Sequence, residues 1–184
     1  KKSLKKDLKK ISKILKKKKI KDPKIIINKT KIKDSTSQRI FKAKKLIGKT
    51  DLLILYGDSL INLNYKKFQL FIKKNSICDI ILSVSNPKEK FGVVKLDKKK
   101  VISFTEKSYD KSKWVNSGWI FLKNKILNKI KNIDLNFEHY LFKENLKILA
   151  FKNYFYYLPI DNISDLKTAN LDWKNNKKNW LNYI

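Results

Sequence analysis

Two short apolar runs constrain the fold of this chain more than any other feature. Asp51–Tyr56 (DLLILY) and Asp79–Ser85 (DIILSVS) are nearly continuous in apolar side chains after their first residue. Runs of this kind are typical of strands that are buried on both faces of a sheet. Between them, Tyr65–Lys74 (YKKFQLFIKK) places its apolar residues at helical spacing. Strand, helix and strand with short connections predict a βαβ unit with two parallel strands.

The rest of the chain continues the alternation of strands and helices. Phe91–Leu96 and Val101–Phe104 flank a charged turn and predict a hairpin. Further elements are expected as follows: a strand at Trp114–Leu122, helices at Lys123–Ile130 and Phe137–Lys143, a strand at Ile148–Tyr157 and a closing helix at Ser164–Trp173. The pattern predicts one α/β domain over residues 35–184.

Residues 1–34 form a separate, strongly basic segment. Residues 1–33 contain sixteen lysines and two aspartates. Four apolar residues recur there at helical spacing: Leu4, Leu8, Ile11 and Leu15. They predict a basic amphipathic helix from Ser3 to about Lys19, which Pro23 closes. Its apolar stripe is narrow and lacks Trp or Phe, which favours a helix packed on the body over one lying on an anionic membrane.

The formal charge of +29, from 45 basic and 16 acidic residues, invites a nucleic-acid interpretation. Every basic residue except Arg39 is lysine, however, and the other abundant residues also have A/T-rich codons. Arginine is the better residue for planar recognition of phosphates. We therefore do not expect specific nucleic-acid binding, although an α/β protein whose basic surface meets nucleic acid remains an alternative.

Composition also excludes several other classes of protein. No run of eighteen apolar residues exists, so no membrane span is expected. A single Cys78 and a single His139 exclude a disulfide framework and argue against a zinc or histidine-based site. No secretory leader opens the chain, which predicts a cytoplasmic protein. The sequence leaves the oligomeric state open, a homo-oligomer included.

The end of the first apolar run is the best candidate for a site. Ligands of open α/β sheets bind beyond the carboxyl ends of strands, and Gly57 and Asp58 stand there. A carboxylate in this position suits Mg²⁺, which takes one or two carboxylates together with substrate oxygens. An ordinary turn aspartate is the alternative interpretation.

Four motifs in order give the chain a family resemblance. Y-G-D-S, F-G-V-V-K-L-D, V-I-S-F-T-E-K and W-V-N-S-G-W-I-F-L follow one another between residues 56 and 122. This order resembles the sugar-1-phosphate nucleotidyltransferases, over about Arg39 to Trp180. The resemblance implies a Rossmann-like nucleotidyltransferase fold, with a mixed, mostly parallel sheet and flanking helices. It also implies transfer of a nucleotide from a nucleoside triphosphate to a sugar 1-phosphate, with release of pyrophosphate.

Within the family, the chain looks most like the branch of glucose-1-phosphate cytidylyltransferases, which serve nucleotide-sugar and surface polysaccharide biosynthesis. Trp114–Gly118 (WVNSG) resembles the W-I-N-G-G strand of that branch, and Asp161–Asp165 (DNISD) resembles its D-T-L-R-D. Most other branches carry the second acid two positions earlier, where this chain has Pro159. CTP and glucose 1-phosphate are the implied substrates. A mannose- or heptose-1-phosphate guanylyltransferase is the alternative.

The resemblance carries over to individual residues. Asp58 and Asp161 match the aspartates that hold Mg²⁺, and Lys107 matches a lysine that contacts the phosphate. The remaining implied substrate-binding residues are Gly92, Glu106, Asn116, Gly118 and Arg39. Asp58, Asp161 and Lys107 are the expected catalytic residues.

Parts of the family pattern are missing. Nothing in residues 1–38 resembles the strand and G-G-x-G-T-R loop that cradle the triphosphate, so we expect the N-terminal βα units to be absent and this chain alone not to bind the nucleotide. Ser37-Gln38, Ser117 and Phe155 stand where the pattern has glycines. The sequence therefore predicts the C-terminal part of an active enzyme, or alternatively a truncated, inactive relative that binds sugar phosphates.

Overall fold

The computed structural model describes residues 26–87, 93–105 and 113–175, together with residues 9, 10, 12, 13 and 17. The chain separates into two units, Lys1–Lys33 and Asp34–Ile184, each of which is described by itself. Most of the helix predicted from Ser3 to Lys19 lies outside the described residues, and the five residues described there are helical. The division into a basic segment and a separate domain stays a prediction.

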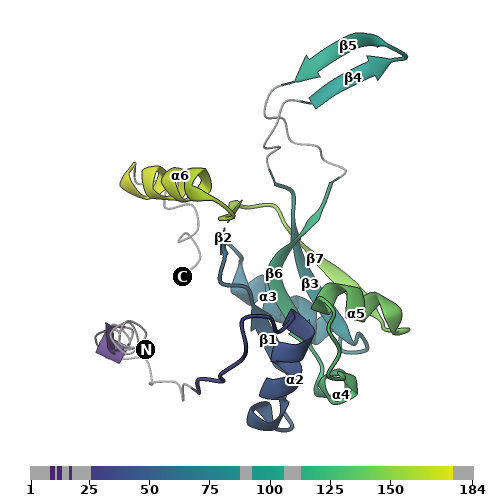
Figure 1. Cartoon of the computed structure of the whole chain (residues 1–184). Coiled ribbons are helices and arrows are strands. Elements are labelled where there is room, and N and C mark those ends of the chain that lie inside the picture. Colours follow the sequence, from purple (N-terminus) through teal and green to yellow (C-terminus); the bar gives the residue numbers. More distant parts are fainter. Residues whose placement is uncertain are drawn as a thin grey trace. The chain divides into compact units, whose positions relative to one another are not determined.

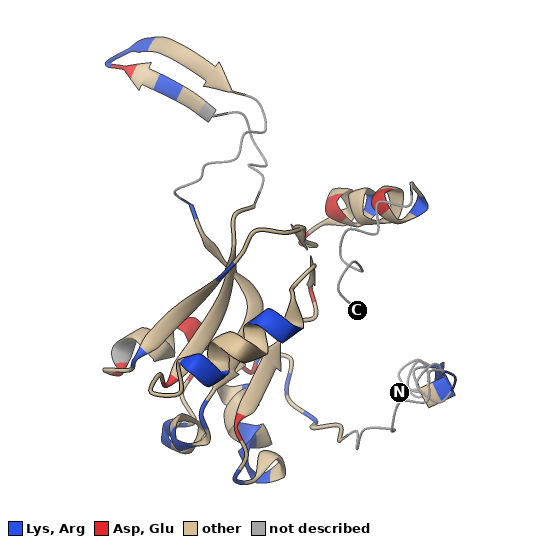
Figure 2. Cartoon of the chain, turned by 180° about the vertical axis from the view of Figure 1, so that it is seen from behind, with Lys and Arg blue, Asp and Glu red and all other residues tan. Residues whose placement is uncertain are grey.

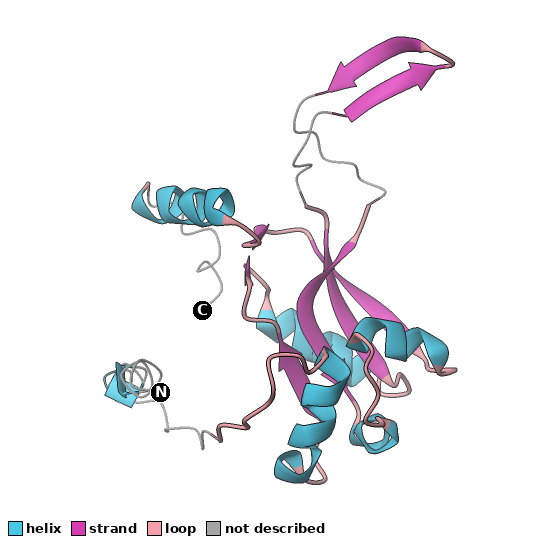
Figure 3. Ribbon diagram, in the orientation of Figure 1, coloured by secondary structure: helices cyan, strands magenta, loops and turns pink. Residues whose placement is uncertain are grey.

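A four-stranded mixed sheet forms the centre of the second unit (Figures 1 and 3). Its strands, in spatial order, are β1 (Leu52–Leu55), β6 (Val115–Leu122), β3 (Ile80–Ser85) and β7 (Ile148–Asn153). β6 is antiparallel to both of its neighbours, and β3 is parallel to β7. β1, β3 and β7 therefore run in the same direction. This arrangement confirms the predicted α/β class with a mixed sheet.

The predicted βαβ unit needs one correction. β1 and β3 run parallel as expected, but they are not neighbours, because β6 lies between them and pairs with both. The reason lies in the β6 sequence, where Trp119–Leu122 (WIFL) is uncharged and presents apolar side chains to both faces. Such a strand stabilises the sheet most when it is central and covered on both sides.

Helices cover the two faces of the sheet (Figure 3). On one face lie α2 (Thr36–Ile47), α4 (Asn124–Lys129) and α5 (Phe137–Lys143), which pack on Ile80, Ile120 and Leu122. On the other face α3 (Tyr65–Lys74) packs through Phe68 on Ile81, with Phe151 in edge contact at 5.2 Å between ring centroids. Each fully buried side chain of this size contributes roughly 1.5–3 kcal/mol, so both layers stabilise the sheet.

Helix α2 was not predicted, although its start carries a recognisable signal. Ser35 and Gln38 form a capping box, in which the Ser35 amide donates to Gln38 Oε1 at 3.0 Å and the Gln38 amide donates to Ser35 Oγ at 3.4 Å. The Phe137 amide donates to Thr36 Oγ1 at 2.7 Å. These contacts join the start of α2 to the start of α5.

The hairpin was predicted correctly. β4 (Val93–Asp97) and β5 (Lys100–Thr105) pair antiparallel, and Lys98 in the turn has a positive φ of 51°. A turn residue with positive φ matches the twist that two-residue hairpin loops require.

The prediction of one strand at Ile148–Tyr157 is wrong at its end, because this segment belongs to two separate strands. β7 stops at Asn153, and β8 (Tyr157–Pro159) pairs instead with β2 (Ser59–Ile61), a short strand that was not predicted. The Asn62 amide donates to the Tyr156 carbonyl at 2.8 Å and extends this ribbon. Helix α6 (Ile163–Lys174) follows, close to the predicted closing helix.

Asp79 connects three parts of the fold at the start of β3. Its carboxylate forms an ion pair with Lys125 at 2.6 Å and accepts from the Lys147 amide at 2.9 Å, and its carbonyl accepts from the Lys123 amide at 3.1 Å. The hydrogen bond from Lys125, and then that from the Lys147 backbone, hold the pKa of the Asp79 carboxyl below its usual range.

Asp79→Asn should therefore lower the free energy of unfolding at pH 7 by about 1–2 kcal/mol. Because the folded-state pKa is depressed, this stabilisation is present above the ordinary carboxyl pKa and is lost on acidification, so the difference from wild type should shrink below about pH 4. Urea unfolding at several pH values measures both effects. Asp134→Asn, at an exposed position, is the matched control and should change stability little; an equal loss in both variants would contradict the assignment.

Candidate active site

The edge of the sheet where β1, β3 and β7 end is here called the carboxyl edge. Because these strands run in one direction, their carboxyl ends meet there, and the antiparallel β6 begins there. Gly57 and Asp58 follow β1, Asn116 is the second residue of β6, and Tyr154 follows β7. This is the position at which open α/β sheets bind ligands.

The β2–β8 ribbon brings the two predicted metal-binding aspartates to neighbouring positions. Ser59 pairs with Pro159, and the Ile160 amide donates to the Asp58 carbonyl at 2.8 Å. Asp161 is the next residue along the chain, and both aspartates are exposed. The backbones of Asp58 and Ile160, which are far apart in the sequence, are thus joined by a hydrogen bond.

The start of α6 fixes the backbone at Asp161. Its amide donates to Asp165 Oδ2 at 3.0 Å, and the Asp165 amide donates to Asn162 Oδ1 at 3.0 Å, which caps the helix. The sequence D-N-I-S-D therefore has a local structural role as well as the predicted one.

Asn116 and Gly118, the predicted sugar-binding residues of β6, take part in a polar network. Asn116 Oδ1 accepts from the Gly118 amide at 3.0 Å, and Asn116 Nδ2 donates to Glu138 Oε1 at 3.1 Å. The Tyr56 hydroxyl donates to the same Glu138 oxygen at 2.5 Å. Burial, then the hydrogen bond to Glu138, and then the negative charges of Glu138 and Asp58 raise the pKa of Tyr56 well above its ordinary value. Tyr56 therefore stays a protonated donor.

Gly118 lies at an irregularity in β6. The pairing with β3 shifts register between Leu82 and Val84, and Gly118 has a φ of 86°. Ser117 is buried, and its hydroxyl is 2.7 Å from that of Ser83, which also accepts from the Trp119 amide at 3.1 Å. The serine that replaces a family glycine at position 117 is thus accommodated by a serine on the adjacent strand.

Four predicted site residues remain: Arg39, Gly92, Glu106 and Lys107. Arg39 lies on α2, exposed, and its Nε donates to the Asp34 carbonyl at 2.9 Å. Gly92, Glu106 and Lys107 lie outside the described residues. Their roles stay predictions.

Two features of this edge were missed by sequence reasoning. Tyr56 and Glu138 are the partners of Asn116 and Gly118, yet Glu138 is an ordinary helix residue in the sequence, and no local signal points to its contact across 22 positions. Beside Asn116, Trp114 packs edge-on against Tyr154 at 5.5 Å between ring centroids, and Lys152 Nζ lies 5.0 Å from the Trp114 ring. The tryptophan in the W-V-N-S-G motif was the available signal.

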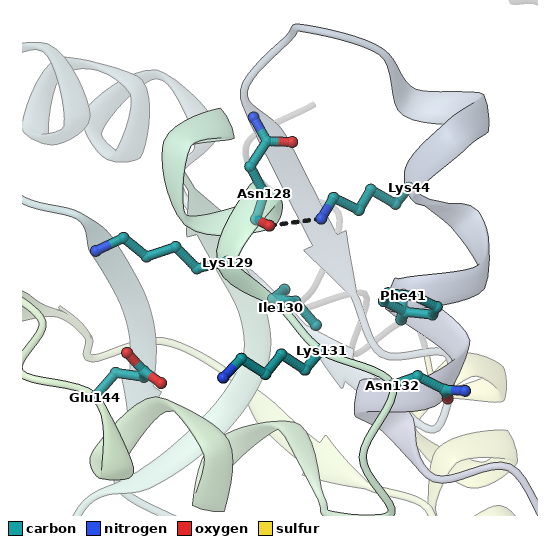
Figure 4. Close-up of a pocket in the computed structure, with 8 residues that line it drawn as sticks. All are labelled: Phe41, Lys44, Asn128, Lys129, Ile130, Lys131, Asn132 and Glu144. Carbon is teal, nitrogen blue, oxygen red and sulfur yellow. Dashed lines mark hydrogen bonds between the residues drawn. The ribbon is translucent and has the colours of Figure 1, made fainter.

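An open cavity in the second unit contains none of the predicted site residues (Figure 4). Its volume is about 660 Å³, and its lining residues are Phe41, Lys44, Asn128, Lys129, Ile130, Lys131, Asn132 and Glu144. Lys44 Nζ donates to the Asn128 carbonyl at 2.6 Å across it. Figure 2 shows lysines on helices, on the hairpin and on loops, so the lysines of this cavity follow the general composition of the chain.

The chain belongs to the nucleotidyl transferase family, whose model matches residues 3–166. This confirms the family that the motif order predicted. The chain is therefore classed among the enzymes that transfer nucleotidyl groups.

Individual relatives agree with this class. A protein of Bacillus subtilis (strain 168) named as a probable glucose-1-phosphate cytidylyltransferase is 24% identical over 161 residues, which are 85% of this chain and 63% of that protein. The chain thus spans less than two thirds of the length of this relative.

Solved structures share the fold. HddC from Yersinia pseudotuberculosis, alone and complexed with GMP-PN, matches with a TM-score of 0.61 and 24% identity over 89% of this chain and 72% of that one. A protein of Bacillus anthracis, provisionally named a glucose-1-phosphate thymidylyltransferase and solved with sucrose, has a TM-score of 0.56 and 15% identity over 77% of this chain and 62% of that one.

Two features are absent from the part of the chain that the structure describes. None of the helices there combines the length and apolar character needed to cross a membrane. Nor do three or more His, Cys, Asp or Glu side chains gather there closely enough to hold a metal by themselves.

Gly118→Ala should destabilise the protein by about 1–3 kcal/mol, because an L-residue at positive φ is strained. The added Cβ would also lie 3.0 Å from Tyr56 Cβ and 3.2 Å from Ser59 Oγ. Gly57→Ala is the matched control, since a Cβ there meets nothing within 4 Å, and it should change stability by less than about 0.5 kcal/mol. Thermal unfolding of both variants tests this; equal melting temperatures would contradict it.

Proposed function

We propose that this chain forms part of a sugar-1-phosphate nucleotidyltransferase, with the carboxyl edge as its active site. The observation that supports the proposal is the β2–β8 ribbon, in which the Ile160 amide, one residue before Asp161, donates to the Asp58 carbonyl. Both carboxylates belong to exposed residues at the edge where the fold binds ligands. The family match supports the class of reaction.

Magnesium suits these donors. Asp58 and Asp161 are exposed carboxylates, and Mg²⁺ takes one or two carboxylates and completes its shell with substrate phosphates and water. When bound, Mg²⁺ would neutralise charge on the transferring phosphoryl group.

The proposed reaction joins two phosphates. A phosphate oxygen of the sugar 1-phosphate attacks the α-phosphorus of the nucleoside triphosphate, and pyrophosphate leaves with the electron pair of the broken bond. Asp58 and Asp161 would hold the metal, and Lys107 would balance phosphate charge. By the resemblance, the residues that would bind the substrates are Glu106, Asn116, Gly118, Gly92 and Arg39. Such a site works by positioning and electrostatics and needs no covalent intermediate.

The proposed substrates are CTP and glucose 1-phosphate. The W-V-N-S-G strand and the place of Asp161, two residues after Pro159, support this choice, as does the name of the Bacillus subtilis relative. A guanylyltransferase is the second candidate, favoured by the fold likeness to HddC, which was solved with GMP-PN. A homo-oligomer and a cytoplasmic location remain predictions.

Binding of glucose 1-phosphate in the presence of Mg²⁺ tests the proposal in this chain. Asp58→Asn and Asp161→Asn should each weaken the metal-dependent affinity at least about tenfold, because each removes one metal ligand (about 1.4 kcal/mol or more). Asp134→Asn changes the net charge equally at a different exposed position and should leave the affinity within about twofold. Isothermal titration at physiological salt, with sulfate as competitor, separates specific binding from attraction to the basic surface.

Pyrophosphate release on adding CTP or GTP, measured in a protein in which this chain is extended by a G-G-x-G-T-R segment that cradles the triphosphate, then decides between the candidates. Release with CTP supports the cytidylyltransferase, and release with GTP supports the second candidate. Binding without release from either nucleotide supports the alternative of an inactive relative. Affinity that is insensitive to Mg²⁺ and to Asp58→Asn would contradict the metal assignment, and no affinity at all would contradict the proposed function.

A further inference from the structure

Glu138 lies between the two polar segments of the carboxyl edge and contacts both. One of its oxygens, Oε1, accepts from the Tyr56 hydroxyl at 2.5 Å and from Asn116 Nδ2 at 3.1 Å. Tyr56 directly follows β1 and lies two residues before Asp58, and Asn116 lies near the start of β6 two residues before Gly118. A single carboxylate oxygen therefore joins the turn that carries one predicted metal ligand to the strand that carries the predicted sugar contacts.

The backbone joins the same two segments a second time. The Tyr56 amide donates to the Gly118 carbonyl at 2.9 Å, beyond the last ladder pair between Leu55 and Trp119. Since Gly118 sits at the register shift of β6 with a φ of 86°, the regular ladder does not by itself fix the strand there. The side-chain bonds to Glu138 supply the second constraint.

The side chain of Asn116 is oriented by this network. Its amide oxygen accepts from the Gly118 amide at 3.0 Å, so its amide nitrogen is the end that donates to Glu138. An asparagine Nδ2 carries two hydrogens, and the carboxylate engages one of them. The other hydrogen keeps a fixed direction as long as the first is held. Without Glu138 only the Gly118 amide holds the Asn116 side chain, and its donor is less preorganised for a ligand.

We propose that Glu138 is the positioning residue of the sugar side of the site, which holds Asn116 in the orientation that donates to a hydroxyl of a hexose 1-phosphate. It acts through Asn116 and Tyr56, and contacts neither substrate nor metal. The inference rests on the proposed function, because it assumes that the carboxyl edge binds a sugar phosphate. It adds a third element, α5, to a site otherwise built from β6 and the β2–β8 ribbon.

The geometry predicts a ranking of the Glu138 variants by their affinity for glucose 1-phosphate, and charge alone does not predict this ranking. Glu138→Gln keeps an acceptor oxygen at the same distance from the backbone and should retain glucose 1-phosphate affinity within about threefold. Glu138→Asp keeps the charge but withdraws the acceptor by one methylene, and Glu138→Ala removes it; both should lose about tenfold or more, which corresponds to about 1.4 kcal/mol. Glu144→Ala, an acidic residue just after the same helix, is the matched control and should bind as wild type.

A second measurement follows the Asn116 side chain itself. The ¹⁵N side-chain amide resonances of Asn116, assigned by Asn116→Asp, should move in Glu138→Ala and Glu138→Asp, and should stay near their wild-type positions in Glu144→Ala. Melting temperatures of all variants, measured alongside, show whether affinity decreases independently of stability. If Glu138→Ala does not fold, the comparison of Glu138→Gln with Glu138→Asp still decides the question.

The outcomes separate this inference from the proposed function. If wild type binds glucose 1-phosphate and Glu138→Asp binds equally well, Glu138 does not position the site and the inference is overturned alone. If Glu138→Gln loses as much affinity as Glu138→Asp, an acceptor oxygen at the right distance is not sufficient, and positioning by that acceptor is overturned. If wild type itself does not bind, the proposed function has failed and the inference falls with it.

Discussion

The insertion of β6 between β1 and β3 is the constraint on which the rest of the structure depends. By pairing antiparallel with both strands, β6 makes them parallel to each other and places its own first residues beside their carboxyl ends. Asn116 and Gly118 reach the carboxyl edge for this reason alone. The apolar segment that anchors β6 lies at its other end, where Ile120 and Leu122 are fully buried. One end of the strand stabilises the fold, while the other carries the polar groups of the site.

Polar residues replace apolar ones as the sheet approaches the carboxyl edge. On β3 the buried isoleucines Ile80 and Ile81 give way to Ser83 and Ser85, which are equally buried. Ser83 contacts the Ser117 hydroxyl at 2.7 Å, and Asn153 Nδ2 donates to Ser85 Oγ at 3.1 Å. Buried hydroxyls are tolerated when they are paired. These residues of the sheet therefore stay buried toward this edge, while their contacts change from apolar to hydrogen-bonded.

Much of the fold could be predicted from the sequence because its signals are local. Continuous apolar runs marked β1 and β3, and helical spacing marked α3. The errors arose where pairing between distant segments decides the bounds and the position of a strand. The position of β6 in the sheet, the break after Asn153 and the pairing of β2 with β8 depend on contacts between distant segments, which periodicity does not record. The motif order predicted Asp58 and Asp161 together, whereas Glu138 stayed hidden because its helix has no site-like signal.

The composition of the chain also bears on how such a site can be selective. With 45 basic and 16 acidic residues, the lysines attract any phosphate, and this attraction falls steeply with salt. Figure 2 shows lysines on many elements, so charge alone gives little information about where a sugar phosphate binds. Selectivity must then come from fixed geometry. At the proposed site such geometry would come from neutral and negative groups, namely the Asn116 amide held by Glu138 and the exposed Asp58 and Asp161, which lysines distributed over the surface cannot reproduce.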